Sequence, residues 1–148
     1  MMKKPKKSMV TVGITAFLML AGCTNTTTSN PELEAGEQVV VDFYEKAFID
    51  YDLKGAEKYL EDPQSDSEEI SQVIKEVKAN GKPIEKIHII DAFNYGEERL
   101  IGVYRSEPND LFEITLSKVG EGWKIEDCKF GGGDPNDLNK YPNKVYEY

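Results

Sequence analysis

The residue with the most distinctive chemistry in this sequence is Cys23, a thiol that follows a run of uncharged residues. Four lysines stand among the first seven residues, and the mostly apolar run from Met9 to Leu20 comes after them. This order of a basic head, an apolar run and small residues is typical of an export signal. As a helix, the run would span only about 18 Å, against a hydrocarbon core of about 30 Å. We therefore expect an export signal and not a membrane-spanning helix.

The segment Leu20-Ala21-Gly22-Cys23 resembles the lipobox of bacterial lipoprotein precursors. The resemblance implies that cleavage between Gly22 and Cys23 makes Cys23 the new N-terminus and that its sulfur carries a diacylglyceryl group. A thiol suits this role because it is nucleophilic and forms a stable thioether. Two acyl chains, with about 0.8 kcal/mol for each buried CH₂, hold a small domain at a bilayer. The expected location is the cell membrane, with the protein lipid-anchored at its extracytoplasmic face. The alternative is a cleaved secretory signal without an anchor.

The charge of the chain limits its partners. There are 18 basic and 27 acidic residues, and four lysines but no acids precede Cys23. The mature chain therefore carries 14 basic and 27 acidic residues, a formal charge of −13. Such a surface repels phosphates, so we expect no nucleic acid partner. The polar tether from Thr24 to Asn30 reaches at most about 25 Å, so a partner, for example another envelope protein, must come close to the membrane.

Cys128 is the second cysteine, and lipidation of Cys23 would leave it unpaired in an exported protein. Disulfides are permitted in that compartment. We expect Cys128 to be a small buried residue of the last strand. The alternative is a nucleophile or an intermolecular bridge.

His88 is the only histidine, and Asp91 follows it three residues later on the same predicted strand. On a regular strand, His88 and Asp91 point to opposite faces because their separation is odd. A direct pair would need a bulge. We therefore expect a half-exposed or hydrogen-bonded histidine and predict that the protein is not an enzyme.

Asp91 shares its strand parity with Ile87, Ile89 and Phe93. If Asp91 is buried among them, its pKa rises and it can act as a base. The alternative is a solvated position at the twisted end of the strand.

The acidic run around Asp62 does not match a calcium-binding EF-hand loop. A loop begun there puts Ser67 where glycine is needed and Val73 where the bidentate glutamate belongs. The glycine run 131–133 has no lysine after it, as a phosphate loop would need. Because the sequence also has no Cys/His cluster for zinc, it predicts neither a metal nor a cofactor.

The order of the predicted elements is helices first and strands second. Helical spacing of apolar residues predicts a first helix from the Asn30-Pro31-Glu32 start signal to about Tyr51 and a second from Asp52 to Asp62. A third begins at a capping box in 65–68 and ends at Asn80-Gly81. Four strands follow at 84–95, 99–106, 111–119 and 123–130, joined by short hairpin connections, with a bulge near Glu126. The tail 131–148 has no clear period and is expected to be loosely attached.

This order, with its closing Gly-x-Gly-Trp-Lys-Ile strand, resembles the nuclear transport factor two-like, cystatin-like superfamily. The resemblance implies an α+β fold in which N-terminal helices pack on a curved, cone-like, four-stranded antiparallel sheet. It also implies a pocket between the sheet and the first helix. The candidates to line that pocket are Tyr44, His88, Asp91, Tyr104 and Trp123.

The sequence therefore predicts four segments: a signal peptide (1–22), a lipidated cysteine with its tether (23–30), an α+β domain (31–130) and a tail (131–148). The first functional hypothesis is a membrane-anchored, non-catalytic protein-interaction module of the cell envelope. The second is a small-ligand binding protein that uses the cone. The third is an enzyme of the isomerase or dehydratase kind based on Asp91, His88 or Tyr104.

Overall fold

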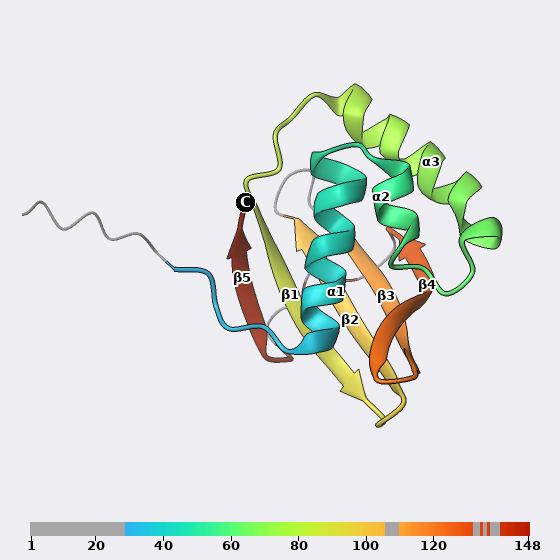
Figure 1. Cartoon of the computed structure of the whole chain (residues 1–148). Helices are drawn as coiled ribbons and strands as arrows, with labels where there is room; N and C mark the ends of the chain where they lie inside the picture. Colours follow the sequence, from blue (N-terminus) through green and yellow to red (C-terminus); the bar gives the residue numbers. More distant parts are fainter. Residues whose placement is uncertain (1–28, 106–109, 132–133, 135, 137–139) are drawn as a thin grey trace, which may run out of the picture.

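The computed structural model describes residues 29–105, 110–131, 134, 136 and 140–148. The predicted cleavage site at Gly22 and Cys23, and tether residues 24–28, lie outside these ranges. Within them the fold is α+β, with three α-helices, one π-helical turn and a five-stranded antiparallel sheet (Figure 1). The strand order is β4-β3-β2-β1-β5, so the strands at 122–130 and 143–147 form the two edges.

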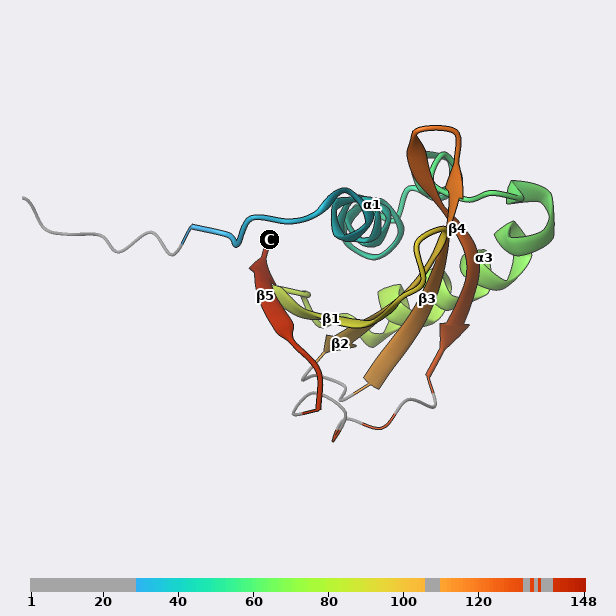
Figure 2. The ribbon, with the colours of Figure 1, turned by 90° about the horizontal axis from the view of Figure 1, so that it is seen from below.

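The helical part comprises α1 (Ala35–Tyr44), η1 (Glu45–Ile49), α2 (Leu53–Glu57) and α3 (Pro63–Asn80). The π-helical turn η1 continues α1 directly, and Asp50 N–H donates to the Glu45 carbonyl at 2.9 Å. Helix α1 lies across one face of the sheet (Figure 2). Helix α3 packs against η1 and α2, away from the β5 edge (Figure 1).

Two predicted helix starts are wrong, because other residues than the predicted ones stand at the N-cap positions. The first helix begins at Ala35, after Glu34, and the Asn30 side chain instead bonds the backbone of Glu147. The third helix begins at Pro63, with Asp62 as its N-cap, whose carboxylate accepts from the backbone N–H of Gln64 and Ser65. Proline at the first helical position fits because its missing N–H has no intrahelical partner there.

The predicted four-strand meander is confirmed as β1 (Lys86–Asn94), β2 (Glu98–Arg105), β3 (Asp110–Val119) and β4 (Gly122–Phe130). The sheet has one strand more than predicted, because β5 (Asn143–Glu147) adds a fifth. It pairs antiparallel with β1, with Tyr146 opposite Ile87 and Lys144 opposite Ile89. Residues 143–147 of the predicted tail are thus paired with the sheet and are not loosely attached.

Two bulges set which side chains face the helices. The predicted bulge in β4 is confirmed, because the register skips Glu126 between Asp127 and Ile125. A second register shift between Asp91 and Phe93 in β1 was not predicted. It leaves Asp91 on the helix-covered face but moves Phe93 to the other face, where it is 42% exposed. The expectation that these two residues share a face is therefore wrong.

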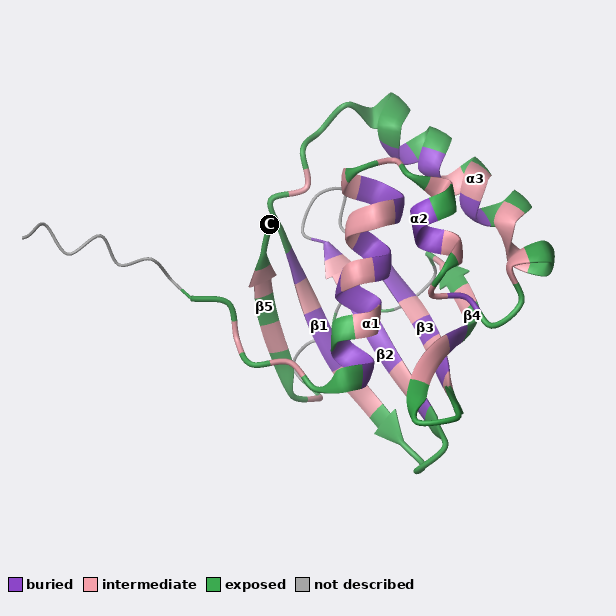
Figure 3. Ribbon diagram, in the orientation of Figure 1, coloured by how far each residue is buried: buried purple, intermediate pink, exposed green. Residues whose placement is uncertain are grey.

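The core lies between α1 and the helix-covered face of the sheet, where buried residues meet (Figure 3). Val40, Phe43, Tyr44 and Ala47 are 0% exposed, and Phe48 follows them on η1. The rings of Tyr44 and Phe48 lie 4.9 Å apart. Side chains thus fill the space in which the sequence placed a pocket.

Candidate functional site

The five side chains predicted to line one pocket lie in separate places. Tyr44 is buried in the core, and Trp123 is half-buried at the start of β4. His88 and Tyr104 face each other across β1 and β2, with ring centroids 5.6 Å apart, on the face opposite the buried Ile89 and Val103. Asp91 lies on the helix-covered face. The predicted half-exposed environment of His88 is confirmed.

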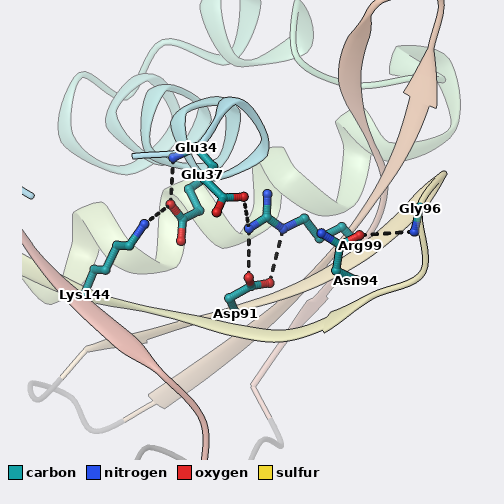
Figure 4. A network of polar contacts seen from close by, with 7 residues as sticks. All are labelled: Glu34, Glu37, Asp91, Asn94, Gly96, Arg99 and Lys144. Atoms are coloured by element: carbon teal, nitrogen blue, oxygen red, sulfur yellow. Dashed lines mark hydrogen bonds and ion pairs between the residues drawn. The ribbon is translucent and has the colours of Figure 1, made fainter. Parts of the chain in front are cut away.

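Asp91 belongs to a network of charged side chains beneath the start of α1 (Figure 4). Arg99 Nε and Nη2 donate to its carboxylate at 3.1 and 2.8 Å, and Nη2 also pairs with Glu34 at 2.9 Å. Glu37 accepts from the backbone N–H of Glu34 at 2.8 Å and pairs with Lys144 of β5. The network thus joins α1, β1, β2 and β5.

Gly36 lets the helix come this close to Arg99. A Cβ at this position would lie 3.1 Å from Leu116 Cδ1 and 3.2 Å from Arg99 Nη1, closer than most Cβ contacts. Arg99 is only 3% exposed, so its charge depends on these carboxylates for compensation. Because each charged group here already has an oppositely charged partner, we interpret the network as a structural joint.

A cleft of about 410 Å³ lies elsewhere, between α3 and the sheet. One side of α3 supplies residues at helical spacing, namely Glu69, Gln72, Val73, Glu76, Val77 and Asn80. The facing wall comes from β2, β3 and the end of β4, namely Arg105, Asp110, Phe112, Phe130 and Gly131. Clefts of this size accommodate a small ligand or a protruding side chain. This cleft is the candidate functional site.

A buried ion pair forms one wall of the cleft. Arg105 is 6% exposed, and its Nε donates to Asp110 Oδ1 at 2.8 Å while Nη2 pairs with Oδ2 of the same carboxylate. Its guanidinium also lies 4.9 Å from the centre of the Phe112 ring, a cation–π contact. The pair is therefore held in a fixed geometry, and its two charges compensate each other.

Tyr44 lies close enough to this pair for both charges to act on its hydroxyl. Burial raises the pKa of Tyr44, and Arg105 and Asp110 have smaller, opposed effects. Its hydroxyl is buried, and none of the described residues forms a hydrogen bond with it. A buried phenol with a raised pKa stays neutral, and Tyr44 packs as a core residue.

A smaller pocket adjoins the cleft, and Glu69 lines both. Asp66, Asp127 and Cys128 also line this smaller pocket. Burial raises the pKa of the Cys128 thiol, and these three carboxylates raise it further. A protonated thiol is a poor nucleophile, so the geometry favours the predicted structural role over a reactive one. Cys128 is half-buried and packs against the core.

Sequence reasoning missed the two buried arginines, Arg99 and Arg105. Both share strand parity with the buried Ile101 and Val103, and this pattern was the available signal. A charge at core parity predicts a nearby acid, because an unpaired buried charge is strongly unfavourable. The sequence does not show which acid pairs with each arginine, because Asp91 and Asp110 lie on different strands beside β2.

Among the described residues, no group of three or more His, Cys, Asp or Glu side chains is placed to hold a metal ion. In the same part of the chain, none of the helices is long and apolar enough to cross a bilayer. Comparisons of the chain with family models, with curated proteins and with solved structures found no match.

Proposed function

We propose that this protein is a bacterial lipoprotein, anchored through a diacylglyceryl group on Cys23 at the extracytoplasmic face of the cell membrane. Its domain then acts as a non-catalytic interaction module of the cell envelope. The observation that carries the proposal is Leu20-Ala21-Gly22-Cys23 at the end of a basic and then apolar leader. The proposal includes that the domain is of the nuclear transport factor two-like kind, with a cone-shaped sheet.

The junction between tether and domain supports a role close to the membrane. The Asn30 amide donates to the Glu147 carbonyl at 2.9 Å and accepts from the Glu147 N–H at 2.8 Å. The chain is therefore attached to the β5 edge at Asn30, and only residues 24–29 separate this point from Cys23. Such a tether reaches at most about 25 Å, which keeps the domain within reach of other envelope proteins.

The positions of the candidate side chains favour this function over the two alternatives. An acid–base enzyme needs polar groups that converge in one cavity. Here His88 and Tyr104 lie on one face of the sheet, whereas Asp91 lies on the other and pairs with Arg99. A small ligand inside the cone would have to displace Phe43 and Tyr44, which are 0% exposed.

Replacement of Cys23 by Ala tests the anchor. We expect the wild-type chain to fractionate with membranes and to incorporate radioactive palmitate, whereas Cys23→Ala should do neither, because no other residue replaces the acylated thiol. Fractionation of cells and labelling of the immunoprecipitated protein measure this. Cys128→Ser is the matched control and should stay membrane-bound and labelled. A Cys23→Ala chain that still sediments with membranes would contradict the proposal.

A further inference from the structure

We propose that the α3 cleft is a docking site for a short cationic segment of a partner protein, which inserts one apolar side chain between two lysines or arginines. The inference rests on the proposed function, since it names the chemistry that an interaction module of this shape would recognise. It stands on three properties of the cleft: its apolar floor, its net charge and the spacing of its acids.

The floor of the cleft is apolar. Val77 and Phe112 are 8% and 4% exposed, so they close the bottom. Val73 and Phe130 are half-buried and lie on opposite walls, one on α3 and one on β4. An aliphatic or aromatic side chain inserted between them would remove these surfaces from water, at about 25 cal/mol per Å² of apolar area.

The charges that line the cleft select a cation. Among the described residues of the lining, Arg105 is the positive one, and Asp110 already compensates it through two contacts. The carboxylates of Glu69 and Glu76 remain, and both residues are exposed. Clefts with low-dielectric walls focus such a field. An anionic ligand would face these two acids.

Neighbouring groups strengthen this field. Asp66 and Asp127 adjoin Glu69 in the next pocket. The lysines of α3 do not line the cleft, and Lys78 lies instead 5.3 Å from the centre of the Tyr51 ring. Helix α3 therefore presents an acidic side to the cleft.

The spacing of the two acids sets the length of the segment. Glu69 and Glu76 are two helical turns apart, about 10 Å along the axis of α3. In an extended peptide, residues one, three and five point to the same side, and the outer two lie about 13 Å apart. Lysine side chains are long enough to bridge the difference. A segment with lysines at positions one and five and an apolar residue at three therefore fits.

The test uses a fluorescein-labelled peptide, Lys-Thr-Leu-Thr-Lys, titrated with the detergent-solubilised full-length protein while fluorescence anisotropy is recorded. We expect saturable binding that Glu69→Gln with Glu76→Gln weakens at least about fivefold, as two lost ion pairs imply. Val73→Trp, which fills the cleft without a change in charge, should weaken it at least as much. Circular dichroism checks that the variants fold.

Glu68→Gln with Glu121→Gln is the matched control, because it removes the same charge outside the cleft lining. This pair should change the affinity less than about twofold. Equal losses in the two pairs would mean general attraction to an acidic protein and would overturn the proposal, as would an unchanged affinity in Glu69→Gln with Glu76→Gln. The titration is repeated with the Cys23→Ala chain, so that failure of the anchor and failure of the cleft give different results.

Discussion

At the scale of single residues, two arginines on β2 organise the polar interior. Arg99 joins the start of α1 to the sheet, and Arg105 forms a wall of the cleft. Each has a bidentate carboxylate partner on the neighbouring strand, Asp91 for Arg99 and Asp110 for Arg105. Bidentate pairs fix orientation as well as distance, because the planar guanidinium matches the carboxylate. Both pairs therefore determine how neighbouring elements meet.

Replacement of Arg99 by Ala should lower the free energy of unfolding by about 2 kcal/mol. Removing one partner from a fully buried pair costs roughly 3–5 kcal/mol. We expect less here because the Asp91 side chain is 30% exposed and water can reach it. Urea unfolding, followed by the fluorescence of Trp123, the only tryptophan, measures the change.

The matched control for Arg99→Ala is Lys46→Ala, which removes the ion pair between Lys46 and Asp50 on the helix surface. Water screens such an exposed pair, so the unfolding midpoint of Lys46→Ala should equal that of the wild type. Equal midpoints for the wild type and Arg99→Ala would show that the network contributes nothing to stability.

At the scale of elements, β5 is the piece that completes the sheet. It covers the edge of β1 and supplies Lys144 to Glu37. After it, the Tyr148 hydroxyl donates to the Val41 carbonyl at 3.3 Å, and the Tyr148 ring stacks on Tyr44 with centroids 6.3 Å apart. The last residues of the chain therefore contact both the sheet and α1.

Removal of residues 143–148 should destabilise the domain by roughly 3 kcal/mol or more, from the loss of several ladder hydrogen bonds at about 1 kcal/mol each. It should also promote aggregation, because β1 becomes an unprotected edge. Urea unfolding and size-exclusion chromatography measure the two effects.

Asn30→Ala provides the comparison for the truncation. It removes only the two hydrogen bonds between the Asn30 side chain and the Glu147 backbone and leaves β5 in place. The free energy of unfolding of Asn30→Ala should fall by only about 1 kcal/mol, since these hydrogen bonds are exposed. A truncated chain as stable as the wild type would mean that β5 is dispensable.

At the scale of the whole molecule, Asn30 and the cleft lie toward opposite edges of the sheet. Asn30 is attached to β5, one edge strand, whereas the cleft is formed by α3 with β2, β3 and the other edge strand, β4 (Figures 1 and 2). If Cys23 carries the proposed anchor, we expect the β5 edge to face the bilayer and the cleft to face away from it.

A fluorophore near β5 should lie closer to the membrane than one on α3. The positions are Val145→Cys and Gln72→Cys, each in a Cys128→Ser background, with the lipidated protein in vesicles that carry a quencher on their headgroups. Because the tether is at most about 25 Å long, we expect quenching at Val145 to exceed that at Gln72 at least about twofold. Equal quenching would mean that the domain has no preferred orientation.

The sequence by itself determined the local features of this protein. Apolar residues at helical spacing located α3, and alternation with short turns located four strands, because these patterns depend on neighbours along the chain. The leader and Cys23 are also local signals, and they support the prediction of a lipid anchor without any fold.

Only the tertiary structure decided which distant residues meet. Strand β5 is five residues long, and each of its residues pairs with one more than fifty positions earlier in the chain, so no local pattern predicts it. The cleft depends equally on long-range packing, because α3 and the strand ends that face it come from separate parts of the chain. The bulge in β1 has the same origin: it separates Asp91 from Phe93 and leaves the carboxylate facing Arg99. Pairing and packing across the fold thus bring core side chains together between α1 and the sheet and form the cleft beside α3.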